Sequence, residues 1–351
     1  MHAADPEGMG RQIEQASNPA EVATIAGQFP TLLLQMAEQH QAADQISRAL
    51  SALGEATTRR LLRLGEAELG PPPIAYAFIV AGSQARCEQI GGSDQDNAMI
   101  LDDAYLPDRH AAYFSRLSAR VCEGLAACGY SLCPGDIMAS NPRWRLTSSG
   151  WLACFGRWIS TPDPLALLHS SIFFDLRCAF GQQSLFDQLH RAILRQTRAN
   201  RLFQGHLAAS ALQFRPPLRW YGGLRFGRSA DGIQLLDLKK FGVTPVVDLA
   251  RVHALASGDP ALGTRARLES MRRDQVLSVA QHDELLAAFD FISSLRIEHQ
   301  ARRIRSGARP DSRLPRSSFT APQQRRLKVA FRRVQAAQRR MARRFCVEAF
   351  K

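Results

Sequence analysis

The stretch AGSQARCEQIGGSDQDN, residues 81–97, places two carboxylates close to a turn made of small residues. It follows an apolar run of strand length and precedes a second one. Asp94 and Asp96 are two positions apart, and residues i and i+2 of a strand lie on the same face of a sheet. We therefore expect both carboxylates to point into the space above the Gly82-Ser83 turn.

These residue types suit phosphoryl or nucleotidyl transfer. Two hard carboxylates on one face suit Mg²⁺, with Mn²⁺ as the alternative, because such an ion is usually held by a few protein oxygens plus substrate phosphates. Gly82 lets the backbone approach a triphosphate, and the N–H groups of Gly82 and Ser83 can donate to phosphate oxygens. A Gly-Ser turn alone is an ordinary loop, and an Asp-x-Asp pair alone is often a solvated edge. Together, with Ser83 and Asp94 eleven positions apart, they favour a catalytic site.

Composition and residue patterns argue against a membrane, secreted, disulfide-rich or zinc-binding protein. The chain has 351 residues, enough for two or three domains, and 45% of them are hydrophobic. No uninterrupted apolar stretch is long enough to predict a transmembrane helix, and the N-terminus lacks the pattern of a secretory signal. The seven cysteines are scattered and form no C-x-x-C pair, which predicts neither disulfides nor a zinc site. We expect a cytoplasmic protein.

The net charge of +13 is concentrated in the last part of the chain. Residues 301–351 contain 16 Lys and Arg against two acidic residues, whereas the first 300 residues are nearly neutral. The segment Gln323–Phe345 has apolar residues at heptad-like spacing and arginines on its other faces. Such a helix could bind nucleic acid, but we favour a helix docked on its own domain with a solvated arginine face. Neither a membrane nor a nucleic acid is the expected partner.

Apolar spacing divides the chain into three regions. Residues 1–70 have helical periodicity and end at the Gly-Pro-Pro-Pro stretch 70–73. Residues 71–183 alternate strand-length and helical runs, which predicts an α/β (α+β) catalytic domain on a small mixed sheet. Residues 184–351 have a helical pattern and predict an all-helical domain that includes the basic C-terminal helix.

The residues of the opening stretch resemble a known family. Gly82-Ser-x-x-Arg-x-Glu-Gln89, followed by Ser93-Asp-Gln-Asp-Asn97, resembles the core motif of the DNA-polymerase-β-type nucleotidyltransferases. More narrowly, it is similar to nucleotidyltransferases related to the N-terminal part of protein-PII uridylyltransferase, which usually follow CBS or cyclic-nucleotide-binding modules. The likeness extends over roughly residues 45–338, including CPGDIMASNPRW at 133–144 and FFDLR at 173–177. It implies a polymerase-β-like catalytic domain followed by a helical substrate-binding domain.

The resemblance also implies roles for individual residues. Gly82 and Ser83 would hold the nucleoside triphosphate, with Arg86 and Glu88 also assigned to nucleotide binding. Asp94 and Asp96 would hold the metal ions. Lys239, in the sequence DLKK, could reach the nucleotide, although a solvated basic turn is an equal alternative.

The superfamily uses a third carboxylate from a later strand, which would bind metal and assist deprotonation of the attacking hydroxyl. Asp175 is the first candidate because it lies in the apolar, strand-length run IFFDLR. Asp136 is the alternative, although it lies in a Pro-Gly turn. The non-catalytic interpretation of Asp175 is a buried carboxylate paired with Arg177.

The expected function is therefore magnesium-dependent nucleotidyl transfer of the uridylyltransferase type. UMP or AMP would move from an NTP to a hydroxyl of a protein or a small molecule. One alternative is a non-catalytic, NTP-sensing protein of signal transduction, and a second is nucleic-acid binding through the basic tail. Residues 1–70 are too few for a CBS or cyclic-nucleotide-binding module, so a regulatory sensor would act as a partner in trans.

Overall fold

The computed structural model describes residues 5–161, 172–220 and 222–350, with side chains to residue 348. Its contacts divide the chain into two compact units. Of the described residues, the first unit contains 5–41, 45–158 and 172–193, and the second contains the others. The sequence-based boundaries at 70 and 183 stay a prediction.

The first unit begins with four helices: α1 (Pro6–Gln15), α2 (Pro19–Ala26), α3 (Phe29–Glu38) and the long α4 (Ala43–Leu69). Local chemistry explains where they start and stop. The Asp5 carboxylate accepts a hydrogen bond from the Gly8 N–H at 2.8 Å and caps α1, which has proline in its first turn. Gly70, with a left-handed φ of 87°, follows α4, and the prolines after it prevent the helix from continuing.

The sheet of the first unit has the strand order β3-β2-β1-β4. The central strand β1 (Tyr76–Ala81) runs antiparallel to both β2 (Asn97–Leu101) and β4 (Leu176–Gly181), whereas β2 and β3 (Arg145–Thr147) are parallel. Every residue of β1 and β2 is buried, which explains why both strands are uninterrupted apolar or uncharged runs. The predicted small mixed sheet is confirmed.

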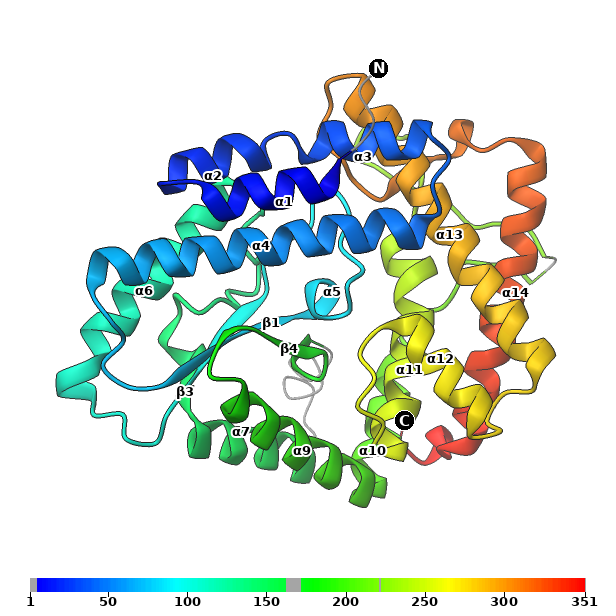
Figure 1. The fold of residues 1–351 in the computed structure, drawn as a ribbon. Helices are drawn as coiled ribbons and strands as arrows, with labels where there is room; N and C mark the ends of the chain where they lie inside the picture. The colour runs from blue at the N-terminus through cyan, green and yellow to red at the C-terminus, as the bar shows by residue number, and fades with distance from the viewer. Residues whose placement is uncertain (1–4, 162–171, 221, 351) are drawn as a thin grey trace. The chain divides into compact units, whose positions relative to one another are not determined.

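Helices cover both faces of this sheet, with α4 on one side of β1 and α7 (Ser148–Ser160) on the other (Figure 1). The helix α6 (Pro107–Ala127) packs against α4, because a Cβ at Gly124 would lie only 2.8 Å from a methyl carbon of Leu61. On the opposite side, the Trp151 Nε1–H donates to the Met99 carbonyl at 2.8 Å and ties α7 to β2. The unit therefore has a helix–sheet–helix core.

The second unit is mainly helical. Its helices are α10 (Arg201–Ala211), α11 (Thr244–Ser257), α12 (Thr264–Arg273), α13 (Val279–Arg305) and α14 (Ala321–Arg344), and the first unit's α9 (Gln183–Ala199) ends in it. A π-helical turn, Lys239–Val243, leads into α11. Residues 245–255 of α11 are all buried, which marks it as the central helix. Figure 1 shows α13 and α14 side by side, in agreement with their contacts.

The second unit also contains short strands that the sequence did not predict. The strands β5 (Gly227–Arg228), β6 (Gln234–Asp237) and β7 (Arg313–Pro315) form an antiparallel sheet in that order. Short 3₁₀ turns lie at Pro142–Trp144 in the first unit, and at Arg316–Ser318 and Val347–Phe350 in the second. The predicted helical domain is confirmed, with this small sheet as an addition.

The basic helix α14 is docked on its own unit. Leu327, Phe331, Val334 and Met341 are at most 1% exposed, so the apolar stripe of the helix is buried and its arginines occupy the other faces. This agrees with the docked arrangement favoured from the sequence. Within the described ranges, no helix combines the length and the apolar character needed to cross a membrane. All seven cysteines are free thiols.

Candidate active site

The turn after β1 requires glycine for two reasons. Gly82 begins the short helix α5 (Gly82–Ala85) with a left-handed φ of 59°, which disfavours any residue with a side chain. In addition, a Cβ at this position would lie 3.2 Å from Oδ2 of Asp96. A carboxylate oxygen therefore lies beside the turn, in the space that a side chain at this position would enter.

One expectation for this turn is wrong. The Gly82 N–H donates to the Asp175 carbonyl at 3.0 Å, as a continuation of the β1–β4 pairing, so it is not available to a phosphate oxygen in this conformation. Ser83 follows in the same turn and is half-buried. The predicted phosphate contacts then depend on Ser83.

Main-chain pairing positions the Asp-x-Asp segment. The Ala81 N–H donates to the Asp96 carbonyl at 2.9 Å, which prolongs the β1–β2 pairing to the residue before Gly82. On the other side of the segment, the Gln95 N–H donates to the Ser131 carbonyl at 3.0 Å. Both carboxylates are thus carried by extended main chain that is held from two sides.

The side chains between and after the two aspartates point into the core. Gln95 and Asn97 are each 2% exposed. The Gln95 amide donates to the Cys122 carbonyl of α6 at 3.1 Å, and the Asn97 side-chain oxygen accepts the Ala139 N–H at 2.8 Å. Because side chains of extended chain alternate, Asp94 and Asp96 belong to the opposite side, and both are half-buried.

Asp175 is fully buried beside this turn and contacts a residue of the motif. Its Oδ2 lies 2.7 Å from a terminal nitrogen of Arg86, and the Arg86 Nε lies 2.7 Å from Glu88. Arg86 and Glu88, predicted to bind nucleotide, are therefore engaged with each other, and Arg86 bridges two carboxylates. Opposite charges at this distance, with little solvent around them, hold each other firmly.

The non-catalytic interpretation named Arg177 as the partner of Asp175, and this pairing is wrong. Arg177 does not pair with it but forms an ion pair with Glu55 of α4. The Arg177 guanidinium also donates to the Gln84 carbonyl at 3.1 Å, and this bond holds the main chain of the turn in place. The sequence reasoning considered only the neighbour two positions away, whereas the observed partner, Arg86, is 89 positions distant.

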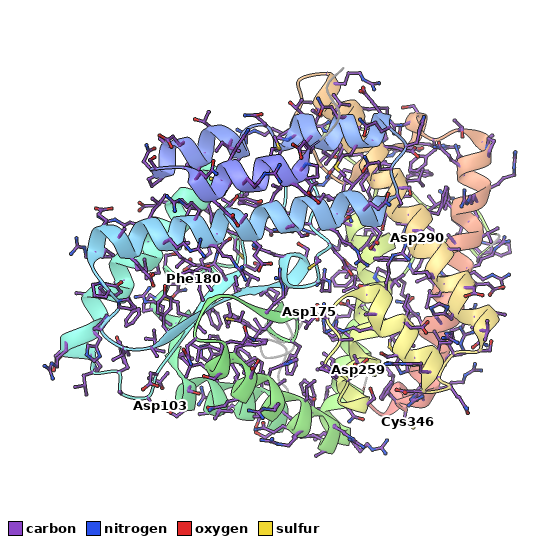
Figure 2. All side chains as sticks on the ribbon, in the orientation of Figure 1. Asp103, Asp175, Phe180, Asp259, Asp290 and Cys346 are labelled. Carbon is purple, nitrogen blue, oxygen red and sulfur yellow. The ribbon has the colours of Figure 1, made fainter. Side chains whose placement is uncertain are left out.

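Aromatic packing fixes the segment that carries Asp175. Phe173, two residues earlier, is completely buried, and its ring centroid lies 4.6 Å from that of Trp144 and 5.3 Å from that of Trp151. Figure 2 labels Asp175 and Phe180 near the two ends of β4. The carboxylate is therefore held by a packed strand end and not by a free loop.

The alternative third carboxylate, Asp136, lies in a turn. It is exposed, has a left-handed φ of 52°, and its Oδ2 accepts the Asn141 side-chain amide at 2.8 Å. Its carbonyl also accepts the Trp144 Nε1–H at 2.9 Å. These bonds stabilise the turn itself, and the choice between Asp136 and Asp175 stays open.

Cys133, in the same turn, is a neighbour of the site that the sequence reasoning did not single out. Burial, and then the adjacent Asp96 carboxylate, raise the pKa of its thiol to about 11. The thiol is therefore protonated at neutral pH and can donate to Asp96. The only sequence signal was its place in the CPGDIMASNPRW stretch.

The carboxylates near the Gly82 turn meet only some of the requirements of a magnesium site. Across the described ranges, no group of three or more His, Cys, Asp or Glu side chains is arranged to hold a metal ion. Magnesium, however, is usually bound by one or two carboxylates together with substrate phosphates, and Asp94 and Asp96 are two such hard ligands. The predicted metal contact of Asp175 stays a prediction. So does the nucleotide contact of Lys239, which is exposed in the second unit.

Comparison with known protein families gives one match mainly in each unit. Residues 27–165 match the family model described as "Putative nucleotidyltransferase DUF294", and residues 201–345 match that of "Putative nucleotidyltransferase substrate binding domain". The first match contains the Gly82 turn and both motif aspartates, whereas Asp175 lies between the two matches. No curated protein matches the chain. The two matches together cover well over half of its length, and the chain belongs to this nucleotidyltransferase family.

Proposed function

We propose that this chain is a magnesium-dependent nucleotidyltransferase that moves a nucleoside monophosphate from an NTP to a hydroxyl of a protein or a small molecule. The family supports the general reaction. The observation that carries the proposal is the position of the Asp96 carboxylate, 3.2 Å from where a Cβ of residue 82 would lie, next to the buried Asp175. A small-residue turn beside acidic groups can receive a polyphosphate and its metal ion together.

The reaction is a displacement at the α-phosphorus. The oxygen of the acceptor hydroxyl bonds to phosphorus, the bond from that phosphorus to the oxygen of the β-phosphate breaks, and pyrophosphate leaves. Magnesium bound to Asp94 and Asp96 would supply positive charge beside the α-phosphate. The hydroxyl proton passes to a carboxylate, for which Asp175 is our first choice. Arg86, now bonded to Asp175, would act as a positioning residue.

The narrower assignment to a uridylyltransferase type depends on the sequence resemblance. UMP and AMP are the two candidate groups for transfer, and a protein hydroxyl is the acceptor that the resemblance favours. A panel of α-labelled UTP, ATP, CTP and GTP with magnesium identifies the base. Manganese in place of magnesium tests the alternative metal.

The direct experiment is transfer of label from the α-position with a matched pair of variants. Asp94→Asn combined with Asp96→Asn should lower the rate by about 100-fold or more, because the ligands for the charge beside the α-phosphate are lost. Asp108→Asn is the control, since Asp108 is an exposed carboxylate at the start of α6. Transfer by the double variant at the rate of the unchanged protein would refute the proposal.

One observation favours a second candidate, a protein that senses NTP without turnover. The Asp175 carboxylate contacts Arg86, and the described side chains contain no ready three-ligand metal group. Calorimetry with magnesium and each NTP separates the two functions. Tight binding, with the nucleotide recovered intact in the presence of every acceptor tested, supports the sensor and contradicts the transferase.

A further inference from the structure

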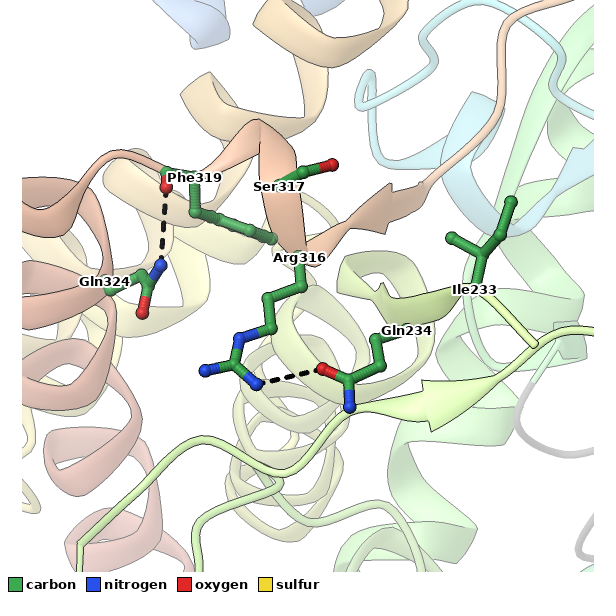
Figure 3. A pocket seen from close by; sticks show the side chains of 6 residues that line it. All are labelled: Ile233, Gln234, Arg316, Ser317, Phe319 and Gln324. Carbon is green, nitrogen blue, oxygen red and sulfur yellow. Dashed lines mark hydrogen bonds between the residues drawn. The ribbon is translucent and has the colours of Figure 1, made fainter.

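Two hollows among the described residues of the second unit differ in how their polar groups are bonded. The larger one, of about 460 Å³, is lined by residues around β6 and the start of α14 (Figure 3). There Arg316 donates to the Gln234 side chain at 3.0 Å, and Gln324 donates to the Phe319 carbonyl at 3.3 Å. Three of its polar side chains, Arg316, Gln234 and Gln324, are thus already bonded within the protein, and we infer no ligand for this hollow.

The smaller hollow, of about 140 Å³, lies between α11, the end of α12 and α14. Its walls are largely apolar and include Leu249, Met271 and Met341, each at most 3% exposed. Two polar side chains, His253 and Arg340, also line it. A third, Arg344, is exposed and lines it from the C-terminal end of α14. We call this space the α11–α14 cavity.

Two buried polar atoms of the α11–α14 cavity lack hydrogen-bond partners in the described part of the chain. His253 is 7% exposed, and its Nδ1 has no hydrogen-bond partner among the residues that the structure describes. The same holds for the Nε of Arg340. Burying such groups unbonded is costly, so native proteins nearly always provide a partner from the chain, from water or from a ligand.

The charge in and around the cavity is positive. Burial, and then Arg344, lower the pKa of His253 to about 3, so this ring is neutral and can donate one hydrogen bond. Burial, and then Arg343, lower the pKa of Arg340, while Glu284 raises it. Glu284 is itself paired with Arg333 at 2.7 Å, which reduces its effect on the cavity. An anion beside Arg340 and Arg344 would offset the burial of the Arg340 guanidinium and the positive charge around it.

We propose that the α11–α14 cavity binds a small organic monoanion, such as a short branched carboxylic acid. The carboxylate accepts hydrogen bonds from Arg340 and Arg344, His253 donates a further bond, and the hydrocarbon part contacts Met271 and Leu249. A dry cavity of about 150 Å³ holds a molecule the size of benzene, so the ligand has about six to eight non-hydrogen atoms. The site lies within the segment that matches a substrate-binding domain, and the proposal is independent of the transfer reaction.

The test uses the full chain and two isosteric probes, isovalerate and its neutral amide isovaleramide. Calorimetry should show one isovalerate bound per chain, and at least about 10-fold weaker binding of the amide, because only the acid carries the charge that the arginines need. Inorganic phosphate should not displace isovalerate, since it lacks the apolar part. Equal binding of acid and amide, or no binding of either, overturns the proposal.

Variants locate the site. Arg340→Gln should weaken isovalerate binding about 10-fold or more, whereas Arg339→Gln, its exposed neighbour on the same helix, should leave the affinity unchanged. Ala337→Leu keeps every charge but fills the cavity, and it should abolish binding. Circular dichroism establishes that each variant is folded. Equal losses in the two arginine variants, or unaltered binding in folded Ala337→Leu, would contradict this location.

Discussion

The candidate active site and the α11–α14 cavity differ in whether the protein provides partners for their buried polar groups. Around the Gly82 turn, the buried Asp175 has a counter-charge, Arg86, at 2.7 Å. In the α11–α14 cavity, Arg340 and His253 each present an atom with no partner in the described part of the chain. The comparison teaches that the protein itself supplies the counter-charge of Asp175, whereas it offers these two cavity nitrogens no partner among the described residues. Replacing the arginine in each region should therefore have different effects.

The largest effect is expected from Arg86→Gln. This change leaves the fully buried Asp175 carboxylate without its cation, and breaking a buried ion pair typically costs about 3–5 kcal/mol. Denaturation by urea, followed by fluorescence of the tryptophans packed near Asp175, measures the change. If Arg86→Gln lost less than about 1 kcal/mol, the pair would behave like an exposed one and the contrast would fail.

The cavity should make stability depend on pH through His253. Its folded-state pKa of about 3 is below the ordinary value of 6.5, so the unfolded chain binds more protons between these values. Stability should fall as pH decreases, by up to about 2 kcal/mol from this residue between pH 7 and pH 5. Burial also lowers the pKa of His299, which acts in the same direction.

Urea denaturation at the two pH values, with and without His253→Gln, measures the contribution of His253. In His253→Gln, the free energy of unfolding should depend less on pH, and the remaining dependence should include the contribution of His299. A variant with the same pH dependence as the unchanged chain would show that His253 is not neutral and buried as described.

A smaller effect is expected at the turn itself. Gly82→Ala places a Cβ in a left-handed conformation, which costs about 1–2 kcal/mol, and brings it to 3.2 Å from Asp96. Gly70→Ala is the matched control, because Gly70 also has a positive φ but no atom within 4 Å of the added carbon. Gly82→Ala should be the more destabilising of the two and should also lower nucleotidyl transfer, whereas equal losses would mean that Asp96 can move aside.

The smallest effect is expected from Arg340→Gln in the absence of ligand. The lost guanidinium had an unbonded nitrogen and a burial penalty, so the free energy of unfolding should change by less than about 0.5 kcal/mol or increase. Urea denaturation beside Arg339→Gln provides the measurement. A large loss of stability would show that Arg340 is as firmly paired as Arg86, and the contrast between the regions would disappear.

The sequence predicted the parts of the site that are close together in the chain. The spacing of Asp94 and Asp96, the Gly82 turn and the buried strand before it follow from periodicity and turn chemistry. It did not predict that Arg86 would hold Asp175, because that contact depends on the register of β4 beside β1. A register one residue away would turn Asp175 to the other face. Arg177, the partner named in the non-catalytic interpretation, instead pairs with Glu55.

In the second unit, the small sheet and the α11–α14 cavity could not be predicted from the sequence for other reasons. The strands β5 and β7 have only two and three residues, which is too short for any alternation of apolar residues to be visible. The α11–α14 cavity combines residues that are separated by up to 95 positions, from Leu249 to Arg344, and His253 lies in a helix that is buried all round. No local pattern distinguishes such a histidine from an ordinary core residue.

The bond from the Gly82 N–H to the Asp175 carbonyl links the movements of two parts of the site. A polyphosphate that pulled the turn outward would draw the main chain of Asp175 with it, and through its side chain would strain the grip of Arg86. A ligand that shifted the turn would therefore also shift the acid.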